Sequence, residues 1–576
     1  MVFALFLAVP LTASRGFWDQ FTSVKWYVLE ALSVAWFLVE LWRCGSGGWP
    51  AFVRQRWPAP VLLGLLVLAS CLRGGLAWGG PALLDRASFV LLALASFWYF
   101  RRNHGRARPV GIATGAAASL VVVVGLAQAL GWDPLPGFSA GDHRSSFFGN
   151  VNMTAQFLGF AVVVLMAGPP GTAMRRVPAS LREALLVLSF VYLWILSCRS
   201  VFLALSAGVA VLRLTGRLSL RSLARTLGVA TLAILLLLQY GPVLGPRGGP
   251  RGAGTPGLGL RPATDKVTST AMRLALWKGT LDLIRDHPLG VGSGSFGEAF
   301  IPYQLGLEEI ATEALLFRTP HNEYLRTLAE EGVVFTAVAA GLLLSLLGRL
   351  VAAARAAPAR SHPGSFLAAG GAFFAVEAFS QFPFGTAFGC LMAALLLGLA
   401  LARIETGAPG AGAVSRGARV SWRLSGTLVA AVVLVLLGRT VASEWLFVNR
   451  TREIGAQEAA CRLDPRNLPA CVTAAWLQAA AGHRGEARAR LVRVLRNAPY
   501  YHPAIRLLGE VAGADGDRRA ACLYLRIYDD LFRGRSALHW RLEASCGGAP
   551  PDGFPGGVRM PYYGAMPLAK VDAADR

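Results

Sequence analysis

The segment best suited to carry chemistry is Arg318-Thr-Pro-His-Asn-Glu-Tyr-Leu-Arg-Thr-Leu-Ala-Glu-Glu-Gly332. It closes a long polar stretch and runs into an apolar helix. His321 stands at the start of this helix, directly after Pro320, which should fix its orientation. Because histidine titrates near neutral pH, His321 could act as a general base toward a hydroxyl group. The alternative is that His321 only hydrogen-bonds the preceding loop.

A second set of candidates consists of arginines and asparagines near the ends of apolar stretches. An arginine at membrane depth costs about 2.5–3.5 kcal/mol on insertion, so it is usually functional or paired. Its planar guanidinium can bind the oxygens of a phosphate or pyrophosphate through two parallel hydrogen bonds. Singly, each arginine is more often an interfacial anchor, but several on the side of His321 favour a pyrophosphate site. The candidates are Arg144, Asn150, Asn152, Arg199, Arg273 and Asn322.

Lys25 and four further histidines complete the candidates. Lys25 lies at the outer start of the second apolar stretch, where it could hold a phosphate. His143 and His287 are weaker candidates for the outer side. His104 and His362 lie in connections that we place in the cytoplasm, so they are excluded from a site on the opposite side.

Two patterns resemble ligand sites, and we expect neither to act as one. Asp282 and Asp286 have the spacing of one helix face, but solvated helix surface is the preferred interpretation. The run from Gly292 to Gly297 matches G-x-G-x-x-G but lacks the strand, helix and acidic residue of a dinucleotide site. A tight turn that brings backbone close to a membrane-bound ligand is favoured there. No His/Cys cluster has metal-ligand spacing, and we predict no metal and no cofactor.

Composition indicates a polytopic membrane protein. Of the 576 residues, 54% are hydrophobic and 15% charged, against roughly 25% charged in a soluble domain. The predicted fold is all-α, a transmembrane helix bundle of about twelve or thirteen spans with a large periplasmic loop and a small periplasmic helical-repeat domain. The candidate spans are 1–13, 24–42, 59–72, 83–100, 110–130, 151–168, 181–197, 200–214, 225–245, 331–350, 365–382, 385–402 and 425–445.

The net charge of +23 is distributed as topology requires, and we predict no nucleic-acid binding. Basic residues cluster in alternate connections, the pattern of cytoplasmic loops. Residues 246–330 and everything after 446 then lie outside. The clusters are Arg43, Arg54 and Arg56; Arg101, Arg102, Arg106 and Arg108; Arg175, Arg176 and Arg182; Arg213, Arg217, Arg221 and Arg225; Arg349, Arg355 and Arg360; and Arg403, Arg416, Arg419 and Arg423.

The same alternation resolves residues 181–214, which form either one over-long helix or a tight hairpin of two. Both flanking connections are rich in arginine and must share a side, so an even number of crossings separates them. We therefore predict a hairpin with Ser197-Cys-Arg199-Ser200 at its outer tip.

The C-terminal region repeats with a period of 34 residues. Pro465, Pro469 and Ala470 recur as Pro499, Pro503 and Ala504, and Gly482 and Ala487 recur as Gly516 and Ala521. This period resembles tetratricopeptide repeats, which would dock a partner, rest against the catalytic loop or only stabilise the fold.

Predicted domains are 1–445, including the loop 246–330; the repeats 446–545; and an irregular tail 546–576. Cys461, Cys471, Cys522 and Cys546 are free to form disulfides in an oxidising periplasm, with undetermined pairing, whereas Cys44, Cys71, Cys198 and Cys390 should act as small apolar residues.

Taken together, four segments resemble the O-antigen ligase/polymerase superfamily, integral-membrane glycosyltransferases of the bacterial inner membrane. They are Arg144…Phe148-Gly-Asn-Val-Asn152, Ser197-Cys-Arg199-Ser, Arg273…Trp277…Asp286-His-Pro-Leu-Gly-Val-Gly-Ser-Gly-Ser-Phe296 and Pro320-His-Asn-Glu-Tyr-Leu…Glu331-Gly, within roughly residues 15–403. Here Cys198 interrupts the family's serine-arginine pair. The resemblance does not account for a thirteenth span or for the repeats.

The resemblance implies transfer of a glycan from undecaprenyl pyrophosphate to an acceptor hydroxyl, commonly on a glycolipid, at the periplasmic face of the inner membrane. Carried over to this sequence, the pyrophosphate-binding arginines are Arg199 and Arg273, and the essential histidine is His321. A pyrophosphate is a good leaving group, so arginines suffice to stabilise its charge and no carboxylate pair is needed. The alternatives kept open are a repeat-unit polymerase, a protein-directed glycan transferase, a transporter or flippase, and a non-catalytic scaffold.

Overall fold

The computed structural model describes residues 1–14, 16–17, 21–43, 53, 56, 58–103, 108–130, 132–135, 145–167, 179–216, 218–244, 266–304, 317–356, 363–405, 416–498, 501–531 and 546. The chain divides into two compact units. Unit 1 comprises Met1–Pro60, Arg86–Asp265 and Gly341–Val435, and unit 2 comprises Val61–Asp85, Lys266–Ala340 and Leu436–Arg576.

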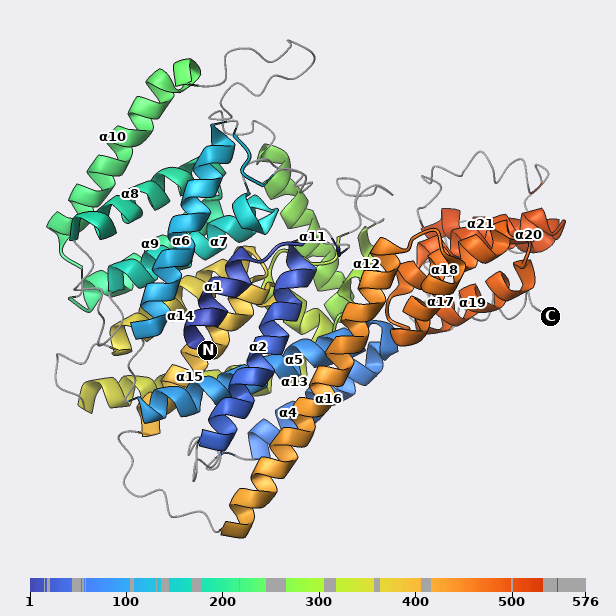
Figure 1. The fold of residues 1–576 in the computed structure, drawn as a ribbon, viewed down its shortest axis with the longest axis horizontal. Helices are drawn as coiled ribbons and strands as arrows, with labels where there is room; N and C mark the ends of the chain where they lie inside the picture. The colour runs from blue at the N-terminus through green and yellow to red at the C-terminus, as the bar shows by residue number, and fades with distance from the viewer. Residues whose placement is uncertain are drawn as a thin grey trace. The chain divides into compact units, whose positions relative to one another are not determined.

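Every regular element within these described ranges is a helix (Figure 1). Unit 1 holds α1 (Val2–Leu11), α2 (Thr22–Arg43), α6 (Arg108–Ala129), α7 (Val151–Ala167), α8 (Ala179–Leu196), α9 (Arg199–Leu214), α10 (Leu220–Leu244), α14 (Pro363–Ser380) and α15 (Ala387–Glu405), with short 3₁₀ turns η1 (Ser146–Phe148) and η3 (Pro383–Gly385). Unit 2 holds α11 (Lys266–Asp286), α12 (Phe296–Gln304), α17 (Ile454–Leu463), α18 (Leu468–Ala480), α19 (Arg484–Asn497), α20 (His502–Ala514) and α21 (Arg518–Leu531). Helices α4 (Pro58–Arg73), α5 (Gly75–Arg102), α13 (Glu323–Ala356) and α16 (Arg416–Asn449) have residues in both units.

The helical, multi-pass character predicted from the sequence is confirmed. A helix covers most of each of the thirteen predicted apolar stretches. Among the described residues, five helical stretches are long and apolar enough to cross a membrane: Ala82–Arg102, Pro109–Ala129, Glu323–Leu350, Ala387–Glu405 and Val420–Asn449. Helix α1 has 10 residues, so its length of about 15 Å is half of the roughly 30 Å hydrocarbon core. The exact number of spans stays a prediction.

Close packing in unit 1 depends on glycines at helix crossings. An added Cβ at Gly208 of α9 would lie 3.0 Å from Val163 Cγ2 of α7 and 3.3 Å from the Ala369 carbonyl oxygen of α14. At Gly159 of α7 it would lie 2.6 Å from Val201 Cγ1 of α9. Helices α7, α9 and α14 therefore meet with their backbones close together, a packing mode typical of membrane helices.

The predicted break in residues 181–214 is present. Helix α8 ends at Leu196, Ser197 has a φ of 55°, and α9 begins at Arg199. The two helices share α7 as a neighbour, but α8 otherwise packs on α6 and α10, and α9 packs on α14. The tip is thus as predicted, while each helix packs chiefly on other neighbours.

The helices of the C-terminal region repeat at the predicted period. Helices α18 and α20 start at Leu468 and His502, and α19 and α21 start at Arg484 and Arg518, 34 residues apart in each case. Successive helices from α17 to α21 pack on one another (Figure 1). The bounds fit two helix pairs of one repeat type; that these are tetratricopeptide repeats stays a prediction.

The cysteines divide by region. Cys461 pairs with Cys471, and Cys522 with Cys546. Cys71, Cys198 and Cys390 are buried thiols, and Cys44 lies outside the described residues. All of the predicted tail after residue 546 also lies outside them.

Candidate functional site

His321 stands two residues before helix α13, held by its neighbours. Its φ of 52° falls in the left-handed region, which costs a residue other than glycine about 1–3 kcal/mol unless the surroundings hold it there. The Asn322 side chain is 4% exposed and its Oδ1 accepts a hydrogen bond from the Leu325 amide at 3.1 Å. Asn322, predicted as a substrate ligand, therefore uses its carbonyl oxygen to cap α13.

Helix α13 does not continue unbroken from His321 into the membrane, as the sequence suggested. Gly332, with φ 85° and ψ 173°, interrupts it. An added Cβ at Gly332 would lie 2.3 Å from the Leu289 carbonyl carbon, and one at Gly290 would lie 2.4 Å from the Glu330 carbonyl oxygen. Only glycines fit where these backbones meet. The kink therefore joins α13 to the turn that follows α11.

Backbone hydrogen bonds fasten this contact. The Val291 amide donates to Ala329 O, the Gly292 amide to Glu330 O and the Val333 amide to Pro288 O, each at 2.9 Å. We call residues 288–293 with 329–333 the glycine junction. It fixes the short helical segment of α13 that follows His321.

The glycine-rich motif serves this junction and not a nucleotide. Gly292 has a φ of 107°, and a Cβ there would lie 2.3 Å from the Gly74 amide nitrogen at the end of α4. Arg73 donates to the carbonyl oxygens of Leu289 and Gly290. The predicted tight turn is confirmed, but the close approach that we expected toward a ligand is made to protein backbone.

Helix α11 carries the second candidate group. This helix ends at Asp286, two residues before Pro288. Trp277 Nε1 donates to the Pro320 carbonyl oxygen at 3.0 Å, which ties α11 to the residue before His321. Arg273 lies one turn earlier on the same helix face. It is partly buried and makes no hydrogen bond or ion pair within the described part of the chain.

Several charges surround this part of unit 2. Arg326 lies 3.9 Å from Glu323 Oε1 and 3.4 Å from Glu330 Oε2, so it neutralises the first turns of α13. Arg318 is exposed and forms no ion pair among the described residues. Burial raises the pKa of Glu298 to about 8, against the opposing charge of Arg318. Partial burial lowers the pKa of His287, and the charge of Asp286 opposes this shift.

The two aspartates of α11 are already engaged. Asp282 lies 3.7 Å from Arg285, and Asp286 accepts a hydrogen bond from the Tyr303 hydroxyl at 2.9 Å. Asp286 therefore links α11 to α12, a contact that the sequence did not reveal.

In unit 1, Arg199 is the first residue of α9, exposed and without an ion pair among the described residues. Beside it, Cys198 Sγ lies 3.3 Å from Asn152 Oδ1 and 3.3 Å from Ser200 Oγ. Gln381 Nε2 donates to Ser200 Oγ at 3.3 Å. The start of α9, the start of α7 and the end of α14 thus meet at the tip that carries Arg199. Cys198 makes polar contacts there, although we predicted an apolar role.

Asn150 and Lys25 have local roles in this unit. Asn150 Oδ1 accepts from the Asn152 amide at 2.8 Å and caps α7. Lys25 is 4% exposed and donates to the carbonyl oxygens of Thr12 and Phe147, with its ammonium 5.1 Å from the Phe148 ring centroid. Its charge ties the end of α1 to η1, which gives it a structural role that the sequence did not predict.

The sequence-predicted site residues thus fall into two groups. Arg273, His321 and Asn322 belong to unit 2, whereas Lys25, Asn150, Asn152 and Arg199 belong to unit 1. Arg144 and His143 lie outside the described residues. Sequence reasoning missed the bond from Trp277 to Pro320. A tryptophan in an otherwise aliphatic stripe was its only signal, because a buried indole N–H usually finds an acceptor.

Comparison with known protein families identifies part of this chain. Residues 184–340 match the family model described as O-antigen ligase. The matched segment contains the tip with Arg199, helix α11 with Arg273, the glycine junction and His321. No curated protein matches the chain.

Proposed function

We propose that this chain transfers a glycan from undecaprenyl pyrophosphate to an acceptor hydroxyl. It carries an O-antigen ligase domain at residues 184–340 and is a multi-pass membrane protein of the O-antigen ligase/polymerase superfamily. The family makes it a glycosyltransferase that acts on lipid-linked glycan. Beyond this, we propose that the donor is carried on a pyrophosphate, that the acceptor is of the ligase type and that transfer takes place in the periplasm.

The proposed reaction needs a base and a site for negative charge. His321 accepts the proton of the acceptor hydroxyl, whose oxygen attacks the anomeric carbon. The bond from that carbon to the pyrophosphate oxygen breaks, and the carrier leaves as undecaprenyl pyrophosphate. Arg199 and Arg273 stabilise the charge that develops on the leaving group. In-line attack inverts the anomeric centre, and the proposed steps use no metal.

One observation carries the proposal most directly: the bond from Trp277 to the Pro320 carbonyl oxygen at 3.0 Å. It places the face of α11 that bears Arg273 beside the residue preceding His321. Arg273, with no ion pair among the described residues, is available for an anion. A base and an arginine held together suit a donor phosphate beside an acceptor hydroxyl.

Two features support the periplasmic orientation. Arginine clusters in alternate connections favour a cytoplasmic location for those connections, which leaves residues 246–330 and the C-terminal region outside. The Cys461–Cys471 and Cys522–Cys546 disulfides of that region are typical of an oxidising compartment. We therefore propose the inner membrane, with His321 and the repeats in the periplasm. We also propose Arg144 and Asn152 as donor or acceptor contacts.

A polymerase that uses a second lipid-linked repeat unit as acceptor is the main alternative, and a protein-directed transferase is another. Glycolipid analysis of a deletion strain separates them: unligated long chains support a ligase, and single-unit chains support a polymerase. A flippase is disfavoured because the charged candidates cluster at predicted membrane ends, whereas transporters place them near the bilayer midplane. Recruitment of a protein through the repeats is a further proposed role.

Purified protein in detergent tests the catalytic roles. His321→Ala, Arg199→Ala and Arg273→Ala should each abolish release of polyprenyl pyrophosphate from a polyprenyl-pyrophosphate-linked oligosaccharide. Arg285→Ala on α11 is the matched control, because among the described residues this exposed arginine makes just a 3.7 Å ion pair with Asp282. Full activity of His321→Ala would refute the proposed base.

A further inference from the structure

The repeats and the loop that carries His321 belong to the same compact unit. Ile301 of α12 connects them: it is 2% exposed and lies in the hydrophobic core of the repeats with Leu468, Leu491, Ile505 and their neighbours. We call helices α17–α21 the repeat domain. A residue of the loop therefore completes the core of a domain that begins about 150 residues later in the sequence.

Helix α12 has two faces with different partners. One face carries Phe296, Phe300 and Tyr303, spaced four and three residues apart. They pack with Leu276 and Leu283 of α11 in a hydrophobic cluster that we call the loop core. Glu298 and Ile301, three residues apart, share the other face. Ile301 enters the repeat core, and burial together with the nearby Glu298 carboxyl group raises the pKa of Tyr501, which directly precedes α20. Helix α12 is thus held between the loop core and the repeat domain.

The chain that leads to His321 returns to α12. Gln304 Oε1 accepts a hydrogen bond from the Phe317 amide at 3.3 Å, and Phe317 packs against the loop core. At Gly297 an added Cβ would lie 3.2 Å from Arg318 Cα. The backbone three to four residues before His321 therefore runs against α12. The orientation of α12 consequently sets the approach of the chain to His321.

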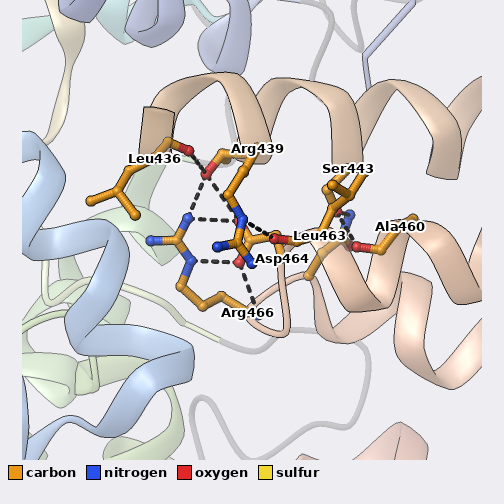
Figure 2. Close-up of polar contacts among 9 residues, drawn as sticks. Leu436, Arg439, Ser443, Ala460, Leu463, Asp464 and Arg466 are labelled. Carbon is orange, nitrogen blue, oxygen red and sulfur yellow. Dashed lines mark hydrogen bonds and ion pairs between the residues drawn. The ribbon is translucent and has the colours of Figure 1, made fainter. Parts of the chain in front are cut away.

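The repeat domain is itself fixed to the end of α16, as Figure 2 shows. Arg439 Nε donates to Leu463 O at 2.9 Å, and Ser443 Oγ donates to Ala460 O at 2.7 Å. The Asp464 carboxylate accepts a hydrogen bond from the Thr440 hydroxyl at 3.0 Å, and the Arg466 guanidinium donates to the same carboxylate. We call these residues the α16 lock. With the lock closed, the repeat domain cannot turn freely about the end of α16.

We propose that the repeat domain is the positioning element of the catalytic loop, with Ile301 as the positioning residue that transmits its hold through α12 to His321. The inference rests on the proposed function for its catalytic meaning. It assigns the repeats a task inside the enzyme that does not require a partner protein. Within this loop, Trp277 of α11 holds the backbone before His321 on one side, and the repeat domain holds α12 through Ile301 on the other.

The test compares Ile301→Ala with Ile301→Val and with Val511→Ala in the full-length protein. Val511 is a 3% exposed core residue ten residues from Tyr501 on α20, about 15 Å along the helix axis. Amide hydrogen exchange of residues 317–325 reports the position of the loop without any substrate. Release of polyprenyl pyrophosphate from a polyprenyl-pyrophosphate-linked oligosaccharide gives kcat and KM.

Ile301→Ala should raise exchange in 317–325 at least fivefold and lower kcat at least fivefold with KM changed less than twofold. Ile301→Val should restore both, and Val511→Ala should leave both near the parent values. Equal effects of Val511→Ala and Ile301→Ala, or unchanged exchange in Ile301→Ala, would overturn the proposal. If the parent protein shows no transfer, the proposed function fails, whereas the exchange data still decide whether the repeat domain holds the loop.

Discussion

Trp277 and Pro320 are joined by a 3.0 Å hydrogen bond from the indole nitrogen to the carbonyl oxygen. The bond links α11, which bears Arg273, to the backbone immediately before His321. On the other side of His321, Asn322 caps α13 and the glycine junction fixes the helical segment that follows. The backbone of His321 therefore has a defined conformation although its φ is unfavourable for a side chain. The proposed base is thus carried on a fixed backbone, and general base catalysis requires that the imidazole be held within reach of the acceptor proton.

Replacing Trp277 with phenylalanine should slow transfer while leaving the fold intact. The variant keeps the aromatic packing but loses one hydrogen bond, which contributes about 0.5–1.5 kcal/mol. Since about 1.4 kcal/mol is tenfold in rate, we expect kcat/KM to fall by about two- to tenfold. Steady-state release of polyprenyl pyrophosphate measures the effect. Trp476→Phe, at a tryptophan that is 55% exposed in the repeat domain, is the control; an equal loss in both variants would contradict a specific role of the bond.

Alanine at Gly290 or Gly332 should destabilise the protein. Both residues have positive φ, and each added Cβ would lie within 2.4 Å of backbone across the junction. Strain and overpacking together should lower the free energy of unfolding by at least about 2 kcal/mol. The midpoint of thermal unfolding in detergent measures this.

Gly341→Ala and Gly348→Ala on the same helix provide the matched controls. An added Cβ at either position has nothing within 4 Å, so alanine should be neutral or raise the unfolding free energy by up to about 1 kcal/mol. A Gly332→Ala variant as stable as these controls would show that the kink is not required.

Local sequence patterns predicted the helices well and the contacts between them poorly. The apolar stretches, the break after Leu196 and the 34-residue period were all visible because apolar runs, charge alternation and repetition can be read along the sequence without knowing which distant residues touch. The roles of Gly332 and Ile301 were not, because each is defined by a partner distant in sequence: Leu289 in one case and the repeat core in the other. Lys25 shows the same limit, since its charge was evident and its acceptor at Phe147 was not.

The stability of unit 2 should fall as pH rises through the titration of Glu298. Burial raises the pKa of this carboxyl group from 4.5 to about 8, with Arg318 opposing the shift. Because the folded state binds the proton more tightly, the contribution is fully present below pH 4.5 and is lost as pH rises toward about 8. Glu298→Gln should flatten the dependence of the unfolding midpoint on pH between 5 and 8. Glu510 pairs with Arg506 on the surface of α20, so the control Glu510→Gln should retain the pH dependence of the parent protein. A Glu298→Gln variant with the same pH dependence as the parent would refute the assignment to Glu298.

Asp464→Asn should loosen the α16 lock (Figure 2). Burial alone would raise the pKa of Asp464, but the hydrogen bonds and charge of Arg466 and the hydroxyl of Thr440 lower it below its usual value of 3.8. The carboxylate therefore stabilises the fold above about pH 4, and this contribution is lost as pH falls below that value. Its charge-assisted bonds are worth about 1.5–3 kcal/mol, so Asp464→Asn should lower the unfolding free energy of the repeat domain by about 2 kcal/mol at pH 7. The control Asp515→Asn breaks an exposed 3.2 Å ion pair with Arg484 and should cost less than about 1 kcal/mol. Hydrogen exchange of the α17 and α18 amides distinguishes the two variants. Equal protection of these amides in both variants would show that the lock does not hold the repeat domain.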